Sequence, residues 1–471
     1  MSMSSSTITA APSRRPESQR GGQVPGTGAA FNPIPTVVAS SAMFLACMDT
    51  LITNLALPTI EAELGGGMAA QQWVVDGYTL PFAVLLLLAG NLSDRFGAKR
   101  AFVAGTAGFA LSSVICSLAG SIGALIFGRA VMGVAAALIL PSSMSLINEA
   151  YRDEASRRRA LAVWGVGGST SAAAGPLLGG LLVPIHWSLV FSINIPVCLA
   201  VLVLCTKIDR SPQAPTPIDL VGQVLAVIGL GGIAGGIIEG GAEGFGAMLP
   251  LTLLAVGAVG TAAFLISQAH VAHPMMPLTL FEHHGMRLAM LGGFAIILNW
   301  NGLVFVTTLF LQQAQGLSPI ASGLAFVPAA ITSTVGNLLS DRLSGQRGVR
   351  FTILLGTAII ASCYALMMAG SAVGALSTWL IGLAVSLAGL GGGMTTPSLA
   401  GLVLKSVNPK QSGIASAVFN TLRQVGGAIG IALFGAFVTI FSPMTAGLAV
   451  SFTLSLILLA AVFAVAIRPT R

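Results

Sequence analysis

Residues 90–95 read GNLSDR, and residues 336–342 read GNLLSDR, the same string with one leucine inserted. Each string ends a long apolar stretch, and further basic residues follow it within a few positions. Such a repeat at equivalent places indicates an internal duplication, which is common in proteins that cross a membrane several times. The two strings therefore predict two related halves, each made of several apolar segments.

The composition around these strings is that of a chain surrounded by lipid. Of its 471 residues, 55% are hydrophobic and only 8% are charged, and the mean hydropathy is +0.89. Soluble domains carry about 25% charged residues. Apolar runs of roughly 20 residues, the length that crosses a bilayer core, recur from Ile34 almost to the C-terminus. The sequence therefore predicts an all-α integral membrane protein.

Fourteen apolar segments are long enough to count as membrane-spanning helices. Because fourteen is even, both ends of the chain are expected on one side of the membrane. If the last six segments repeat the first six, the seventh and eighth form an inserted hairpin between two pseudo-symmetric six-helix bundles. The predicted segments are 36–60, 70–92, 99–120, 124–148, 160–183, 187–206, 220–239, 248–268, 288–313, 318–339, 350–370, 377–404, 413–438 and 445–467.

The basic residues test this count, because Lys and Arg accumulate in cytoplasmic loops. With both termini in the cytoplasm, 20 of the 22 basic residues fall on the cytoplasmic side. The opposite loops carry acids, of which Glu239 and Glu243 are expected to be solvated. The net charge of +7 then reflects topology and not nucleic-acid binding. The cytoplasmic residues are Arg14, Arg15, Arg20, Arg95, Lys99, Arg100, Arg152, Arg157, Arg158, Arg159, Lys207, Arg210, Arg287, Arg342, Arg347, Arg350, Lys405, Lys410, Arg468 and Arg471.

The predicted organisation has four parts. Residues 1–33 form a disordered cytosolic tail that lacks the apolar region of a signal peptide. Residues 34–206 form the N-terminal six-helix bundle, 207–287 a linker with two extra helices, and 288–471 the C-terminal six-helix bundle. We expect no metal site, because the five cysteines lie in apolar runs and the loop histidines lack further ligands. These histidines are His270, His273, His283 and His284.

Four motifs stand in order along the predicted spans. Residues 48–58 read MDTLITNLALP in the first span, and the fourth span has Arg129 followed by Gly133. The loop after the second span contains Gly90, Asp94, Arg95, Gly97, Lys99 and Arg100. The fifth span contains Gly175, Pro176, Gly179 and Gly180. From about residue 36 to 467 the chain resembles the major facilitator superfamily, and more narrowly its 14-span family of drug:proton antiporters.

The chain departs from the family's motifs at two positions, and it also resembles one particular branch of the family. Leu51 stands where the family has threonine, and Ser171 where it has another glycine. Residues 72–78 read QWVVDGY, and Asp76 there resembles the exporters of quaternary ammonium and other organic cations. Those exporters can carry a further acid deep in the C-terminal bundle, which this chain lacks. Residues 420–427, NTLRQVGG, are also similar to the family.

The resemblance implies a multi-pass protein of the cytoplasmic (inner) membrane that exports lipophilic, cationic drugs or toxic compounds in exchange for protons. It implies no cofactor beyond the coupling proton, and we expect a monomer whose partners are its substrate and membrane lipid. The residues between Gly90 and Arg100 are expected to act as a conformational latch, with Asp94 bonded to a different helix. The glycines and proline of the fifth span are expected to serve gating. The chain has no phosphate-binding G-x-x-x-x-G-K-[ST] loop, so ATP is not the direct energy source.

Four ionisable residues lie well inside the predicted spans, namely Asp49, Asp76, Arg129 and Arg423. An aspartate at the centre of a membrane helix costs roughly 2.5–3.5 kcal/mol, so such residues usually face a cavity and are functional. At 1.5 Å per residue, Asp49 and Asp76 lie about 16 and 9 Å from the outer ends of their helices, within reach of a shared vestibule. A carboxylate there binds either a proton or a cation, which is the basis of antiport. We predict proton coupling by Asp49, Asp76 and Arg129, and a structural role for Arg423.

Substrate contacts are expected from aromatic and polar residues in the spans, because an aromatic face attracts an organic cation. Asn301 lies as deep in the ninth span as Asp49 does in the first. The candidates are Asp76, Trp73, Tyr78, Asn299, Trp300, Asn301 and Tyr364.

Other interpretations stay open at this point. Asp49 and Asp76 can cap or cross-link helices, and Arg129 can serve simple ion-pair packing. The charged latch residues can be a solvated run, and Trp73 and Tyr78 can anchor the membrane interface. The same fold can export a neutral or anionic metabolite, such as an antibiotic or an amino acid. A membrane-embedded transferase would need a hydrophilic catalytic loop, and the predicted loops are short, so we expect no enzymatic activity.

Overall fold

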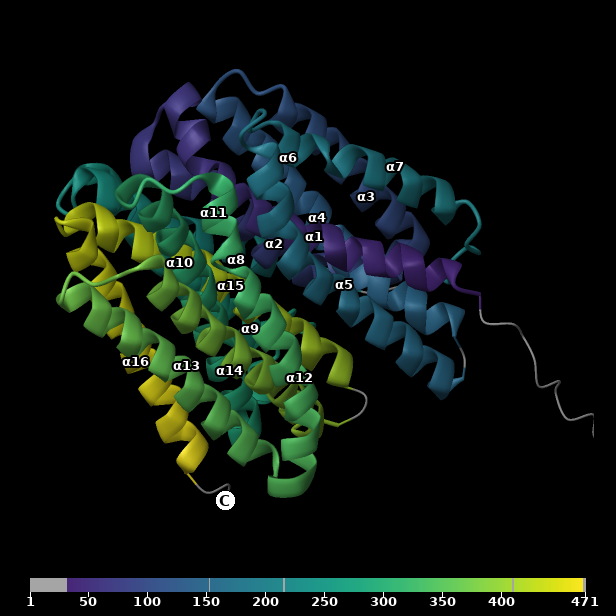
Figure 1. Cartoon of the computed structure of the whole chain (residues 1–471). Helices are drawn as coiled ribbons and strands as arrows, with labels where there is room; N and C mark the ends of the chain where they lie inside the picture. The colour runs from purple at the N-terminus through teal and green to yellow at the C-terminus, as the bar shows by residue number, and fades with distance from the viewer. Residues whose placement is uncertain (1–31, 152, 215–216, 409–410, 469–471) are drawn as a thin grey trace, which may run out of the picture. The chain divides into compact units, whose positions relative to one another are not determined.

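The computed structural model describes residues 32–151, 153–214, 217–408 and 411–468, which form helices joined by loops (Figure 1). The predicted tail, except Asn32 and Pro33, lies outside the described residues. The first helices are α1 (Ile34–Leu64), α2 (Gly67–Phe96), α3 (Ala98–Ser117), α4 (Ile122–Ala150), α5 (Glu154–Leu182), α6 (Leu189–Ser192), α7 (Asn194–Cys205), α8 (Leu220–Glu243) and α9 (Met248–His270). The later elements are the 3-10 helix η1 (Leu278–Glu282), α10 (His284–Leu309), the π-helix η2 (Phe310–Ala314), α11 (Pro319–Leu324), α12 (Val327–Arg347), α13 (Val349–Ala372), α14 (Thr378–Lys405), α15 (Ser412–Ile440) and α16 (Met444–Ile467).

Twelve helices among the described residues are long and apolar enough to cross a membrane. Two predicted segments do not meet that criterion. Segment 160–183 lies in α5, whose many Gly, Ser and Ala residues lower its hydropathy. Segment 187–206 forms the short helices α6 and α7, which are separated at Ile193. The protein is therefore all-helical in its described parts, and the count of fourteen spans stays a prediction.

Local sequence determines where several helices begin. Ser and Asp side chains at the N-cap accept a hydrogen bond from a backbone N–H of the first turn, which otherwise has no partner. Proline residues inside α1, α2, α4, α5 and α14 do not end these helices, as is common in membrane helices. The capping residues are Ser121, Asp153, Asp219, Ser318 and Ser377.

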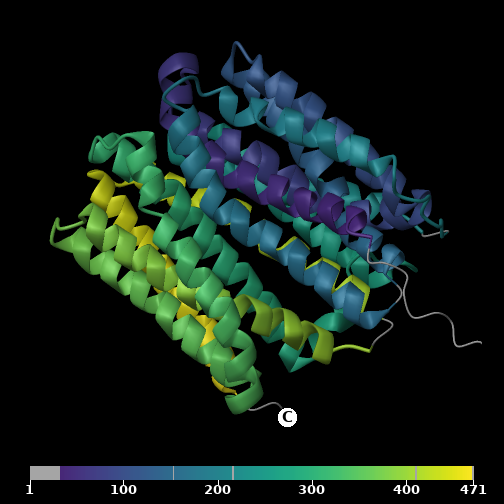
Figure 2. The same cartoon turned by 45° about the vertical axis from the view of Figure 1, so that its right-hand side comes forward.

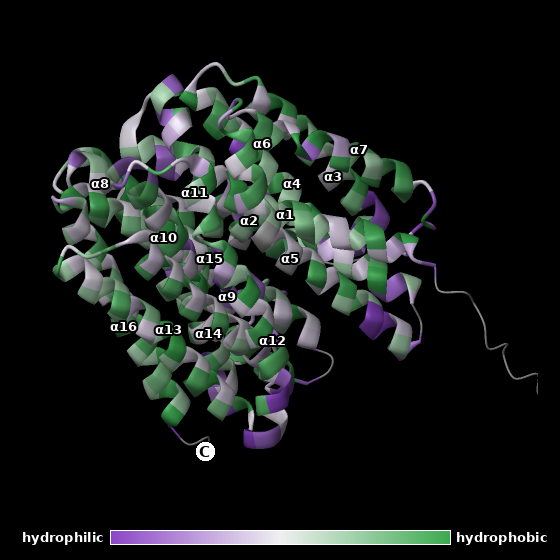
Figure 3. Ribbon diagram, in the orientation of Figure 1, coloured by the Kyte–Doolittle hydropathy of each residue, from purple (hydrophilic) through white to green (hydrophobic). Residues whose placement is uncertain are grey.

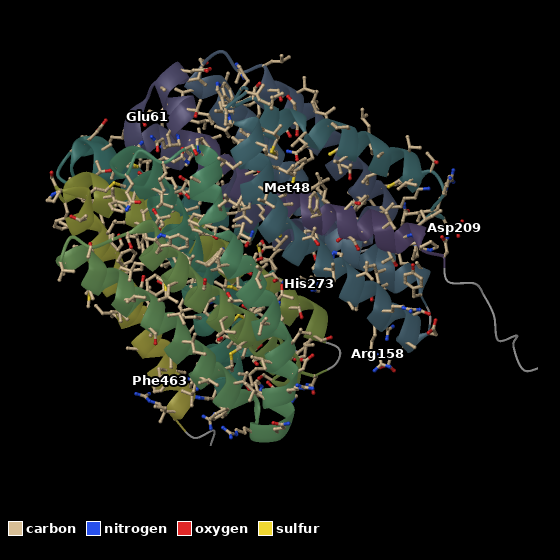
Figure 4. All side chains as sticks on the ribbon, in the orientation of Figure 1. Met48, Glu61, Arg158, Asp209, His273 and Phe463 are labelled. Atoms are coloured by element: carbon tan, nitrogen blue, oxygen red, sulfur yellow. The ribbon has the colours of Figure 1, made fainter. Side chains whose placement is uncertain are left out.

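The long helices lie side by side (Figures 1 and 2), and hydrophobic residues follow their lengths while hydrophilic ones gather at their ends (Figure 3). Figure 4 labels Glu61 near one end and Arg158 near the opposite end. We call the first the Glu61 end, where α1 stops and α2 begins. We call the second the Arg158 end, where α2 stops and α5 begins.

The helix pairings follow the same order twice along the chain. In the first half, α1 packs on α5, α2 on α4, and α3 on both α4 and α7. In the last half, α10 packs on α15, α12 on α14, and α13 on both α14 and α16. Small residues allow the close crossings. A methyl group added at Gly133 of α4, for example, would lie 2.3 Å from the backbone oxygen of Tyr78 on α2.

The inserted hairpin, α8 with α9, contacts both halves. Its helix α8 packs on α2 and on α15. The side-chain Nε2 of Gln223 on α8 donates to the backbone oxygen of Val84 on α2 at 3.1 Å. A small apolar cluster joins the three helices and consists of Leu80, Ala83, Val84, Leu230, Ala234 and Ala428.

Candidate functional site

A buried ion pair lies within the N-terminal half. Asp49 on α1 and Arg129 on α4 are both 0% exposed, and Nη1 of Arg129 donates to the Asp49 carboxylate. The Nε of Arg129 donates to the backbone oxygen of Val74 on α2, 2.9 Å away. Three predicted spans are therefore joined at one guanidinium. Removing either charge would leave the other buried without a counter-charge, which is strongly unfavourable.

Two aromatic rings enclose this guanidinium. Its Cζ lies 4.5 Å from the ring centroid of Tyr78 on α2 and 5.7 Å from that of Phe191 on α6. The Tyr78 hydroxyl donates to the backbone oxygen of Ala46 on α1 at 3.2 Å. Tyr78, predicted as a substrate contact, thus packs on the ion pair. Phe191 was not predicted, because one aromatic residue in an apolar segment carries no distinctive signal.

Asp76 on α2 occupies a different environment. It is 0% exposed, and neither carboxyl oxygen has a hydrogen-bond partner in the described part of the chain. Residues two apart on a helix point to nearly opposite sides, so Asp76 faces away from Tyr78 and the ion pair. Residues four apart share a face. Gln72 donates from Nε2 to the backbone oxygen of Ala432 on α15 at 2.8 Å, so Asp76 lies on the α15-facing side of α2.

The expected vestibule shared by the two aspartates is therefore not observed. Asp49 contacts Arg129 on one side of α2, whereas Asp76 lies on the other side, toward the C-terminal half. The depth of each residue in its span was used to place them together. Depth along a helix gives no information about which face a side chain occupies, so the shared vestibule stays a prediction.

Trp73 is held by the inserted hairpin. Its Nε1 donates to Oε1 of Glu239 on α8 at 2.8 Å, and a methyl group added at Gly235 would lie 3.3 Å from its ring. Glu239, expected in a solvated loop, is instead partly buried within α8, because this helix continues to Glu243. The predicted substrate contact Trp73 thus faces α8.

The candidates in the C-terminal half are dispersed. Asn299 on α10 is 0% exposed, and both its amide atoms are without a partner in the described residues, as is unusual for a buried polar group. Trp300 is partly buried against the main apolar core. Asn301 lies against α15, since a methyl group at Gly427 would be 2.4 Å from its Nδ2. Tyr364 packs between α13 and α16, with its ring 6.0 Å from that of Phe452.

Arg423 on α15 has local partners. Its Nη1 donates to Oδ1 of Asn420 at 3.2 Å, and its Cζ lies 5.5 Å from the ring centroid of Phe419. All three residues belong to the same helix, and the predicted structural role of Arg423 stays a prediction.

The predicted latch lies at the Arg158 end and is covered by the segment after α7. The backbone N–H of Lys99 donates to Oγ of Ser211 at 2.9 Å, and Nε2 of Gln213 donates to the backbone oxygen of Phe96 at 3.1 Å. Gly97 has a φ of +89°, and a methyl group there would lie 3.1 Å from the backbone oxygen of Ser211. A glycine is therefore required at this turn.

The side chain of Asp94, within this latch, is exposed and forms no ion pair among the described residues. Its bond to a different helix stays a prediction. A pocket of about 310 Å³ lies between the latch and the covering segment. Three basic residues line it, so it repels a cation and does not fit the expected substrate. Its lining is Phe96, Gly97, Lys99, Arg100, Arg210, Ser211 and Gln213.

The glycines of α5 allow that helix to lie tightly between α1 and α11. Methyl groups added at Gly175 and Gly179 would lie 2.9 and 3.1 Å from the side chains of Leu51 and Ile52 on α1. A methyl group at Gly180 would lie 2.6 Å from Cα of Ile320 on α11. Across the same interface, a methyl group at Gly323 would lie 2.6 Å from the backbone oxygen of Pro176.

Further bonds join the two halves at the Glu61 end. Nε2 of Gln313 on the π-helix η2 donates to Oε2 of Glu61 at 3.1 Å, and Nε2 of Gln312 donates to the backbone oxygen of Leu55 at 3.2 Å. Gln71 on α2 also donates to the Glu61 carboxylate. In this conformation the two halves are therefore in contact around the Glu61 end of α1.

Comparison with known proteins places this arrangement in context. The sequence model described as Major Facilitator Superfamily matches residues 39–431. The methylenomycin A resistance protein of Streptomyces coelicolor is 31% identical over 434 residues, which are 91% of each chain. The cephamycin export protein CmcT of Amycolatopsis lactamdurans is 34% identical, over 84% of this chain and 83% of that protein. The multidrug efflux pump LfrA of Mycolicibacterium smegmatis is 30% identical, over 87% and 81%.

Solved structures share the fold at low identity. A peptide transporter POT in complex with sulfate aligns with a TM-score of 0.71 and 15% identity, over 93% of this chain and 96% of that one. The human organic anion transporter MFSD10 aligns with a TM-score of 0.63 and 15% identity, over 92% and 99%. These structures support the fold and carry no argument about substrate.

Proposed function

Because the chain belongs to the major facilitator superfamily, whose members similar to it are drug and antibiotic resistance exporters and not enzymes, we propose that it is a proton-coupled exporter of lipophilic, cationic drugs or toxic compounds. It acts in the cytoplasmic membrane, as a monomer, with both termini and the Arg158 end on the cytoplasmic side. The distribution of basic residues supports this orientation and the count of fourteen spans.

The observation that carries the proposal is the contrast between the two buried aspartates. Asp49 is paired with Arg129, whereas Asp76 is fully buried without any partner in the described residues. An isolated buried carboxylate is far more costly than a neutral carboxyl group. We propose that Asp76 binds the coupling proton in this conformation. An arriving cation replaces that proton, and a returning proton replaces the cation.

The energetics require such coupling. Moving a divalent cation outward against 100 mV costs about 2 × 2.3 kcal/mol, which returning protons must supply. Two carboxyl groups that titrate during the cycle, Asp49 and Asp76, are enough to carry two protons. Arg129 competes with a proton for Asp49, so release of the ion pair accompanies proton uptake there.

Transport into proteoliposomes with an imposed pH gradient tests the proposal. Purified protein should drive ethidium uptake only when the lumen is acidic, and a protonophore should stop it. An equal rate without a gradient would contradict proton coupling. A matched liposome with Asp49→Asn protein controls for passive dye leakage.

A second candidate is export of a neutral or anionic natural product. It is favoured by the amide of Asn299, which is buried without a partner in the described residues and offers both a donor and an acceptor. Relatives named for cephamycin and methylenomycin also favour it. The same liposomes distinguish the two candidates. Gradient-dependent uptake of a neutral antibiotic, with none of ethidium, would favour this candidate.

A further inference from the structure

The inserted hairpin packs against α2, the helix that carries Asp76. We call the buried surroundings of the Asp76 side chain the Asp76 compartment. Along α2, Trp73, Leu80 and Val84 share one face, and all three contact α8 or its apolar cluster. Gln72, Asp76 and Ala83 share the neighbouring face, where Gln72 bonds to α15 and Ala83 joins the cluster that includes Ala428. Asp76 therefore lies where α2, α8 and α15 meet.

At this junction one side-chain hydrogen bond among the described residues joins α8 to the Glu61 end of α2. The carboxylate of Glu239 accepts the indole N–H of Trp73 at 2.8 Å, and Glu239 makes no ion pair among the described residues. Trp73 precedes Asp76 by one helical turn. Glu243 lies one turn further along α8 and is exposed. Its side chain forms no hydrogen bond or ion pair in the described part of the chain, so it is a matched control for Glu239.

We infer that Glu239 is a positioning residue for Asp76, because its bond to Trp73 holds the inserted hairpin against α2 and closes the Asp76 compartment on that side. The hairpin is then a working part of the transporter and not a lipid-facing spacer. The inference rests on the proposed function for the role of Asp76, but the contact itself can be tested without transport.

The physical reason is the isolation of Asp76. Its carboxyl group has no partner in the described residues, so its protonation depends on the exclusion of water. The apolar cluster that follows Trp73 along α2 consists of small and aliphatic side chains. The Trp73 ring itself lies against Gly235 of α8. A hydrogen bond to a charged group changes an opening equilibrium by about tenfold or more. Loss of the Glu239 bond should therefore raise the population of the state in which Asp76 is open to water by about tenfold.

Maleimide labelling measures this opening directly. In a chain with its five native cysteines replaced by alanine and with Asp76→Cys, labelling should be slow. Adding Glu239→Ala or Trp73→Phe should accelerate labelling about tenfold, since either change removes the same bond. The two changes together should give no further acceleration. Glu239→Gln keeps a neutral acceptor oxygen and should label more slowly than Glu239→Ala, and the control Glu243→Ala should label as slowly as the parent.

Equal acceleration by Glu243→Ala, additive effects of Glu239→Ala and Trp73→Phe, or rapid labelling in Glu239→Gln would each overturn the inference. In transport, Glu239→Ala with Asp76 intact should raise the KM for a bis-cation more than for ethidium, and Glu239→Gln should restore it. If the wild-type protein transported no cation while the labelling pattern held, the proposed function would fail and the positioning role of Glu239 would stand.

Discussion

The guanidinium of Arg129 on α4 is paired with the carboxylate of Asp49 on α1, and neither side chain reaches solvent. One carboxyl oxygen of Asp49 and one terminal nitrogen of Arg129 still have no partner in the described residues. The pair is therefore incompletely satisfied in this conformation. A purely structural cross-link would be expected to satisfy all of these buried atoms.

Asp49→Asn should both destabilise the protein and stop coupled transport. The change leaves the Arg129 charge buried without a counter-charge, at a cost of roughly 3–5 kcal/mol. A lower melting temperature in detergent, together with loss of efflux for every cation, is the expected result. Asp49→Asn combined with Arg129→Gln removes both charges and should recover the melting temperature without recovering transport. Recovery of transport in the double variant would assign the pair to structure alone.

Gly180→Leu should prevent the close contact of α5 with α11. The added side chain meets Cα of Ile320, and overpacking typically costs about 1–3 kcal/mol, so this conformation should become at least fivefold less populated. Maleimide labelling of Leu55→Cys, which is buried at the same contact, should become correspondingly faster. Gly165→Leu is the control, because nothing lies within 4 Å of a methyl group there. Similar labelling in both variants would contradict gating by this motif.

Much of the fold could be predicted from sequence because a bilayer imposes simple rules. Apolar length predicted the helices, and the motifs at Asp49, Arg129 and Gly180 predicted the superfamily, which the comparisons confirm. Segment 187–206 was the weakest prediction, since apolar length alone does not show the break at Ile193 between α6 and α7.

The arrangement of the site could be predicted only in part. From sequence, Arg129 could pair with either Asp49 or Asp76, and the structure pairs it with Asp49. The sequence analysis did not assign Asp76 to a face of α2, although helical periodicity from Gln72 and Trp73 would have done so. Gln72, a polar residue inside a span, was the available signal for the contact with α15. The partner of Trp73 required tertiary structure, since Glu239 lies in the inserted hairpin.

Topology reporters test the orientation and the count of spans together. A reporter fused after residue 185 or 244 should read outside, and one fused after residue 155, 212 or 345 should read inside. The expectation follows from basic residues at the inner helix ends. A reporter that reads outside at 212 would show that one of α5 and α6–α7 does not cross the membrane.

Asp94→Asn should slow turnover strongly while leaving drug binding nearly unchanged. The residue lies at the Arg158 end, remote from Asp76 and from the Glu61 end, and its exposed carboxylate is free to pair when the halves move. Equilibrium binding of a fluorescent cation and the efflux rate should be measured on the same preparation. An equal fall in binding and efflux would place Asp94 in the binding site or in folding.

The two aspartates should differ in the substrates they affect. In the proposed mechanism Asp49 accepts the proton needed in every cycle, so Asp49→Asn should stop efflux of monovalent and divalent cations alike. The Asp76 carboxyl group has no hydrogen-bond partner among the described residues, so Asp76→Asn should leave the melting temperature nearly unchanged. Asp76→Asn should reduce efflux of a bis-cation more than that of ethidium. The divalent substrate needs two carboxylates to balance its two charges, whereas the monovalent one needs a single carboxylate. Efflux of both dyes across a range of pH should also show a shifted optimum in each variant, as expected if both carboxyl groups titrate during the cycle. Equal losses for both substrates in both variants would remove the division of roles, and full activity of Asp49→Asn would exclude Asp49 from proton coupling.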